Sequence, residues 1–159
     1  MMLFEATRYG AMTAPTNKEV TKSTPAHMEM LADRMWHELW NAGNLEVAYE
    51  IIGEDYIGHV PGPLGEIKGP DGFAQLVATC RSAFPNLHVT VEDVMIANDK
   101  LVIRWTSRGT NTQDFMGIPA THKSIEVPGI TILRVANGLI VEEWEGFDTM
   151  SMMRQLGLA

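Results

Sequence analysis

The chain has 159 residues, enough for one domain whose core buries roughly two thirds of the unfolded surface. It carries 12 Lys plus Arg against 20 Asp plus Glu, and the net charge of −8 argues against nucleic acid and anionic membranes as partners. No stretch approaches the roughly 18 consecutive apolar residues of a membrane span, and the N-terminus lacks the apolar centre of a signal peptide, so we expect a cytoplasmic protein.

Residues 1–24 differ in composition from the rest of the chain. They show no hydrophobic period, and their second half is polar and contains proline. Such a segment buries too little apolar surface to fold by itself, so we expect a flexible or partner-docked arm. A single domain is predicted to follow at residues 25–159.

The domain opens with the signals of a helix. Thr24 suits an N-cap, and Pro25 suits the first helical position because its missing N–H is not needed there. Apolar residues at three- and four-residue spacing then continue to Gly43, which suits the end of a helix. Two further helices are predicted, at about 44–53 and 69–85.

Two features of this helical half concern binding. Trp36 and Trp40 could line a pocket or fill the core, and aromatic stripes at helical spacing more often fill the core. The loop 55–65, rich in Gly and Pro, carries Tyr56 and His59, and loops over a rigid scaffold often hold binding groups. His59 could donate a hydrogen bond to a substrate carbonyl, or it could simply bond to the backbone.

After Pro85 the hydrophobic period changes from about 3.6 to 2. Asn137-Gly138 favours a two-residue hairpin turn, in which Ala136 would pair with Leu139. We predict an α+β domain with three N-terminal helices packed on a curved, mainly antiparallel sheet and a short C-terminal helix. The long strands are predicted at 87–97, 101–109, 123–135 and 139–148, with a further short strand at 56–60 and the last helix at 149–156.

The last strand carries the candidate catalytic carboxylates. Because side chains alternate along a strand, Glu142 and Trp144 are predicted to face the interior, and Glu143 and Glu145 the solvent. A carboxylate in an apolar setting has a raised pKa and becomes a candidate acid or base, although a buried ion pair would perturb it equally. Glu142 is therefore the first candidate. Glu143 is the second, because a bulge before Gly146 would exchange the two faces.

Other polar candidates have a structural alternative that we favour. Asp148 is the third acidic candidate, but its place before the last helix also suits an N-cap. Arg104 could bind an anionic group or orient Glu142, or it could pair with an acidic neighbour. Cys80 is expected to be a buried, unreactive thiol, and no cluster of His or Cys has the spacing of a metal site.

The remaining candidates would line a flat pocket for an aromatic or polycyclic ligand: Trp36, Trp40, Tyr56, Trp105, Phe115, Met116 and Trp144.

Short motifs along the chain carry a family resemblance. They are Trp40-Asn-Ala-Gly-Asn44, Asp55-Tyr-Ile-Gly-His59, Ala83-Phe-Pro-Asn-Leu87, Val102-Ile-Arg-Trp-Thr106, Gly109-Thr110, Phe115-Met-Gly-Ile-Pro119, Arg134-Val-Ala-Asn-Gly138, Ile140-Val-Glu-Glu-Trp144 and Gln155-Leu-Gly157. In this order and spacing they resemble the SnoaL-like polyketide cyclases, which belong to the nuclear transport factor 2-like superfamily of cone-shaped α+β domains. The resemblance covers about residues 28–157.

The resemblance implies a cofactor-independent aldol ring closure of a polyketide ester, in which an acidic residue near the last strand removes a proton from an activated methylene. The family pattern has an Asp before the Trp of this strand and a His in the preceding strand. Here Glu142 and Glu143 precede Trp144, and Val127-Pro128-Gly129 stands where the His would be. The alternatives are an isomerase, a dehydratase or an epoxide hydrolase on the same fold, or a non-catalytic small-molecule-binding or assembly domain.

Two kinds of partner are expected. One is a small hydrophobic or aromatic molecule, with no cofactor. The other is a second copy of the chain, because the convex face of such a sheet needs cover. Ile130 and Ile132 lie opposite Glu142 under the predicted pairing and would suit the interface of a homodimer.

Overall fold

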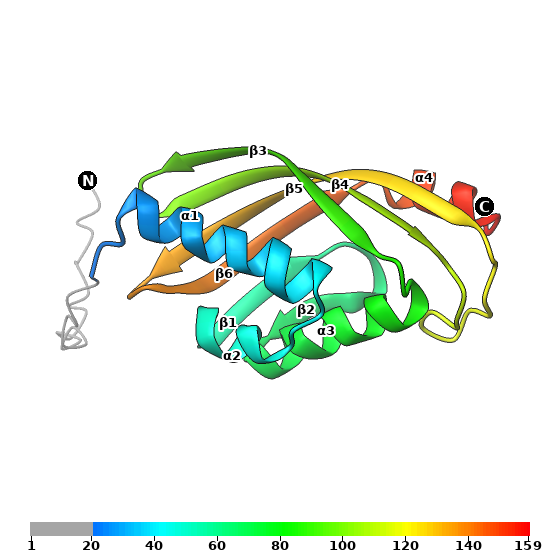
Figure 1. Cartoon of the computed structure of the whole chain (residues 1–159), viewed down its shortest axis with the longest axis horizontal. Coiled ribbons are helices and arrows are strands. Elements are labelled where there is room, and N and C mark those ends of the chain that lie inside the picture. The colour runs from blue at the N-terminus through cyan, green and yellow to red at the C-terminus, as the bar shows by residue number, and fades with distance from the viewer. Residues whose placement is uncertain (1–20) are drawn as a thin grey trace, which may run out of the picture.

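The computed structural model describes residues 21–159 of the chain. Most of the predicted N-terminal arm, residues 1–20, therefore lies outside the described residues. Figure 1 shows helices on one side of a long curved sheet, with α1 beginning at one end of the molecule and α4 lying at the other. This arrangement confirms the predicted α+β architecture.

The helices begin and end close to where the sequence predicts. α1 (Pro25–Asp33) has Thr24 as its N-cap, whose Oγ1 accepts a hydrogen bond from the backbone N–H of His27 at 3.2 Å. The same helix continues as η1 (Arg34–Asn41), a π-helical turn with wider spacing between hydrogen-bonded residues. α2 spans Glu46–Ile51 and α3 spans Gly69–Ala83.

Six strands form one sheet in the order β2-β1-β6-β5-β4-β3. All neighbours are antiparallel except β1 and β6, which run parallel. The turn at Asn137-Gly138 pairs Ala136 with Leu139, as predicted. The strands are β1 (Ile52–Val60), β2 (Gly65–Lys68), β3 (His88–Ala97), β4 (Lys100–Thr110), β5 (Ser124–Ala136) and β6 (Leu139–Phe147), with a 3-10 turn η2 (Gly62–Leu64) and the helix α4 (Thr149–Leu156).

A bulge in β6 decides which side chains of that strand face inward. Ile140 pairs with Val135, but the next pair is Glu142 with Arg134, so Val141 is an extra residue without a partner. A bulge of this kind exchanges the two faces for every residue that follows. The side chain of Ile140 is buried, and the next inward side chain is that of Glu143 rather than Glu142. The predicted faces of Glu142 through Glu145 are therefore wrong.

The core lies between the helices and the inner face of the sheet. Its largest cluster joins η1, α2 and α3 to β1, β4, β5 and β6, and a smaller cluster packs α4 against β5 and the end of α3. Thr131 and Leu133 of β5 are buried in this layer, and they pair with Glu145 and Glu143. Thr131 and Leu133 therefore lie on the face of Glu143 and Glu145.

The opposite face of the sheet is largely uncovered in the described part of the chain. Ile130 is 49% exposed there, and Ile132 pairs directly with Trp144. Ile132 thus shares the face of Glu142 instead of opposing it. The homodimer predicted for this face stays a prediction. No helix among residues 21–159 is long and apolar enough to cross a membrane.

Candidate active site

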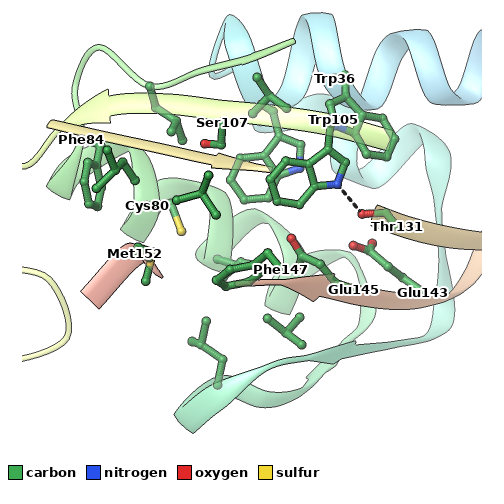
Figure 2. Close-up of a pocket in the computed structure, with 18 of the residues that line it drawn as sticks. Trp36, Cys80, Phe84, Trp105, Ser107, Thr131, Glu143, Glu145, Phe147 and Met152 are labelled. Atoms are coloured by element: carbon green, nitrogen blue, oxygen red, sulfur yellow. Dashed lines mark hydrogen bonds between the residues drawn. The ribbon is translucent and has the colours of Figure 1, made fainter. Parts of the chain in front are cut away.

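A cavity of about 120 Å³ lies between the helices and the inner face of the sheet and is partly open to solvent. Its wall is mostly apolar, and among residues 21–159 the only carboxyl groups that line it are those of Glu143 and Glu145. Figure 2 shows both carboxyl groups on the same side of β6, directed toward Trp105 and Thr131. The lining residues are Trp36, Trp40, Val60, Leu64, Leu76, Cys80, Phe84, Leu87, Val89, Trp105, Ser107, Phe115, Ile125, Val127, Thr131, Glu143, Glu145, Phe147 and Met152.

Glu143 is only 5% exposed and is held by one strong hydrogen bond. The Tyr56 hydroxyl donates to its Oε2 at 2.8 Å. Gly58 is the β1 neighbour of Glu143, and a Cβ on it would lie 2.5 Å from the Tyr56 oxygen, so the missing side chain leaves room for this contact. Burial raises the pKa of Glu143 to about 7, although the bond from Tyr56 favours the ionised form and opposes the rise.

Glu145 lies two residues further along β6 and faces the same cavity. No hydrogen bond joins its carboxyl group to another side chain or backbone group in residues 21–159. Burial, with a further contribution from the nearby charge of Glu143, raises the pKa of Glu145 to about 8. Two carboxyl groups this close titrate as a pair, so near neutral pH they share about one proton. The hydrogen bond from Tyr56 favours the ionised form of Glu143.

Trp105 and Thr131 lie next to these carboxyl groups (Figure 2), and Thr131 pairs with Glu145 across β5 and β6. The indole Nε1–H of Trp105 donates to Oγ1 of Thr131 at 2.8 Å, which leaves the Thr131 hydroxyl hydrogen free for another acceptor. Trp105 pairs with Gly129 of β5, and a Cβ on Gly129 would overlap the indole ring. The indole can therefore lie flat over β5 only because residue 129 is glycine.

The helices supply the remaining aromatic wall. Trp36 and Trp40 are both on the π-helical turn η1 and both line the cavity, and the ring of Trp40 packs edge-to-face on Phe73 in the core. Phe115, from the loop after β4, packs edge-to-face on Phe84 with ring centroids 5.8 Å apart. The lining function predicted for Trp36, Trp40, Trp105 and Phe115 agrees with their positions in the structure.

Comparison with known proteins gives a consistent assignment. The family model described as SnoaL-like polyketide cyclase matches residues 30–156. The chain belongs to the SnoaL-like polyketide cyclase family.

Solved structures show the same fold, which is that of the nuclear transport factor 2-like superfamily. TsrD from Streptomyces laurentii superposes with a TM-score of 0.78 at 25% identity, over 87% of this chain and 100% of that one. IdmH from Streptomyces antibioticus superposes with a TM-score of 0.70 at 30% identity, over 81% of this chain and 97% of that one. No curated protein matches the chain in sequence.

The acidic residue first expected to act in this SnoaL-like domain is outside the cavity. Glu142 lies on the opposite face of the sheet, where its carboxylate accepts hydrogen bonds from Nε and Nη2 of Arg134 at 3.0 and 2.9 Å. His59 lies 3.1 Å from the other carboxylate oxygen, and its ring stacks on Trp144 at 5.6 Å. The hydrogen bond from His59 and then the pairing with Arg134 lower the pKa of Glu142. The predicted inward orientation of Glu142 and Trp144 is wrong, and His59 does not line the cavity either.

Three further candidates also lie away from the cavity of this SnoaL-like protein. Arg104 is an exposed residue of β4 and does not line the cavity. Met116 is 44% exposed at the tip of its loop. Asp148 is the N-cap of α4, with Oδ1 accepting from the backbone N–H of Ser151 at 2.8 Å, which is the structural role that we favoured. Tyr56 is buried and does not line the cavity, and its hydroxyl donates a hydrogen bond to Glu143.

Sequence reasoning missed Glu145, Thr131, Ser107 and Phe147 as lining residues. Glu145 alternates with Glu143, so the sequence could have paired them once the bulge was known. Cys80 lines the cavity, and burial raises the pKa of its thiol to about 12, which agrees with the predicted unreactive thiol. Within residues 21–159 no group of three or more His, Cys, Asp or Glu side chains is placed to hold a metal ion.

Proposed function

We propose that Glu143 and Glu145 form the acid–base pair of a cyclase that acts on an aromatic or polyketide carbonyl compound. The observation that carries the proposal is the position of both carboxyl groups, on one face of β6, inside an aromatic cavity where burial raises their pKa values toward neutrality. Groups with pKa values near the working pH are the most effective general acids and bases. Membership of the SnoaL-like family supports the same class of chemistry.

In the proposed reaction the Glu143 carboxylate removes a proton from the carbon next to a carbonyl group. Glu145, which holds the shared proton, donates a hydrogen bond to the carbonyl oxygen and stabilises the enolate that forms. The enolate carbon then attacks a second carbonyl carbon of the same molecule, and one carbon–carbon bond forms. The resulting alkoxide takes a proton from a carboxyl group of the pair, so the enzyme returns to its starting protonation state.

The Tyr56 hydroxyl orients the base in this proposal. Its hydrogen bond holds the Glu143 carboxylate against the cavity and keeps it less basic than burial alone would. An isomerase or a dehydratase would use the same first step, because each begins with proton removal next to a carbonyl. Epoxide hydrolysis by two acids bridged by an arginine is not favoured, because Arg104 is outside and no arginine lines the cavity within residues 21–159.

The experiment measures the proton-removal step directly. Exchange of the α-hydrogens of a neutral aryl ketone, 1-indanone, is followed by NMR in deuterated buffer near neutral pH. We expect exchange above the buffer rate with the wild type and a rate about a hundredfold or more lower with Glu143→Gln. Glu142→Gln is the matched control, since it changes the neighbouring glutamate on the opposite face.

Two outcomes would contradict the proposal. One is a wild-type exchange rate equal to that of buffer, which would favour a binding domain without chemistry. The other is equal loss of exchange in Glu142→Gln and Glu143→Gln, which would return the catalytic role to the outer glutamate or to the stability of β6.

A further inference from the structure

The cavity contains acidic and aromatic side chains but no basic one. Within the described residues, neither Lys, Arg nor His lines it. The aromatic lining residues are Trp36, Trp40, Phe84, Trp105, Phe115 and Phe147. Any negative charge on the two carboxyl groups is therefore without a cation in the same cavity.

Glu142 on the outer face has cationic partners of the kind that the two cavity glutamates lack among the described residues. Glu142 is the neighbour of Glu143 in sequence, yet on the outer face it is paired with Arg134 and His59. Inside, Glu143 receives only the neutral Tyr56 hydroxyl, and Glu145 receives no hydrogen bond from the described residues. Burying a charge without a partner is costly, so this cavity favours any ligand that brings a positive charge.

We propose that the cavity binds a protonated or quaternary amine carried on a flat apolar group, with the cation between the carboxyl groups of Glu143 and Glu145 and the tryptophan rings. Aromatic faces attract cations through their quadrupoles, most strongly when the pair is shielded from water. In Figure 2 the rings of Trp36 and Trp105 lie on the side of the cavity toward which the carboxyl groups point. A volume of about 120 Å³ matches a ligand of one aromatic ring with a small ammonium group, extending toward the open end.

Such a ligand would also change the protonation of the pair. A bound cation stabilises the carboxylate form and so lowers both pKa values, which in the free protein lie near neutrality. Binding near pH 7.5 would therefore release a proton to the buffer. A carboxylate ligand would meet two acidic groups and no counter-charge, so the same cavity excludes anions.

This inference goes beyond the proposed function, because it concerns what the cavity binds and needs no turnover. The test compares three single-ring probes of similar shape by quenching of tryptophan fluorescence: phenyltrimethylammonium, its neutral isostere tert-butylbenzene, and benzoate. We expect phenyltrimethylammonium to bind at least tenfold more tightly than tert-butylbenzene, and benzoate not to bind. Calorimetry of phenyltrimethylammonium in phosphate and in Tris at pH 7.5 should show different apparent enthalpies, because a proton is released.

The variant Glu145→Gln, which keeps the shape of the side chain, should reduce the preference for the cation at least tenfold and change tert-butylbenzene binding less than twofold. Glu142→Gln is the control and should keep the full preference. Equal dissociation constants for cation and isostere in the wild type would overturn the inference without any variant. So would an unchanged preference in Glu145→Gln, or benzoate binding as tight as that of the cation. Failure of the exchange experiment with a neutral ketone would leave these binding results unaffected, so the two proposals fail separately.

Discussion

The Tyr56 hydroxyl donates a hydrogen bond of 2.8 Å to Oε2 of Glu143, joining β1 to β6 on the cavity side of the sheet. The two residues are far apart in sequence, and β1 and β6 bring them together as parallel neighbours. This bond lowers the pKa of a carboxyl group that burial raises. It therefore sets the pH at which the proposed base becomes ionised.

Replacing Tyr56 by Phe removes this hydrogen bond and keeps the ring that packs edge-to-face on Phe73. The pKa of Glu143 should rise, because burial then acts without opposition. We expect the rising, acidic limb of the pH–exchange profile to move to higher pH and the free energy of unfolding to fall by about 1 kcal/mol. Tyr49→Phe is the control, since Tyr49 donates to Asp71 at an exposed site. An identical shift in both variants would contradict the role of Tyr56.

The raised pKa values of Glu143 and Glu145 predict how stability depends on pH. Their pKa values rise from 4.5 in the unfolded chain to about 7 and about 8 in the folded protein. Their favourable contribution to the free energy of unfolding is therefore complete below pH 4.5 and is lost as the pH rises through 7 to 8.

Glu145→Gln removes one of these titrations, so its free energy of unfolding should fall less than that of the wild type between pH 5 and pH 9. We expect a difference of about 2 kcal/mol, in favour of the variant at pH 9. Urea unfolding across this range measures it. Parallel curves of unfolding free energy against pH for the variant and the wild type would show that Glu145 is solvated in the folded state.

Gly129→Ala should disturb the cavity through Trp105. The new Cβ would overlap the indole ring, which must then move away from β5 toward the cavity. Such overpacking costs typically 1–3 kcal/mol, and here it should also weaken the binding of aromatic ligands. Gly146→Ala on the adjacent strand is the matched control, because nothing lies within 4 Å of the added Cβ. Thermal unfolding measures the stability of both variants, and fluorescence titration measures their affinity for aromatic ligands. Equal stability and equal affinity in the two alanine variants would contradict this account.

Asp148→Ala tests whether this acidic residue is only structural. It removes the N-cap of α4, whose Oδ1 accepts from the N–H of Ser151, and should cost about 1 kcal/mol of unfolding free energy. Ketone exchange per folded molecule should not change, because Asp148 does not line the cavity. Asp148→Asn, which caps equally well, should restore the stability. A loss of exchange in both variants would give Asp148 the catalytic role after all.

The sequence by itself determined the elements and the fold. The change of period after Pro85 separated helices from strands, and Asn137-Gly138 fixed the pairing of Ala136 with Leu139. Thr24 and Asp148 were identified as helix caps because a cap depends on only a few neighbouring residues. Trp36 and Trp105 were named as pocket candidates because of their residue type, although the helical spacing of Trp36 favoured the core, and in the structure both residues belong to the core and also line the cavity.

Only the tertiary structure decided which glutamate faces the cavity. Strict alternation points to Glu142, but the unpaired Val141 advances β6 by one residue relative to β5 and turns Glu143 and Glu145 inward. The sequence allowed for a bulge, which made Glu143 the second candidate, but whether the bulge forms depends on how two strands and the helices above them pack together. For the same reason Tyr56 and Glu143, from strands remote in sequence, were not predicted to meet. The sequence supplies the carboxylates, and the packing of β6 against β1 and β5 decides which of them are buried.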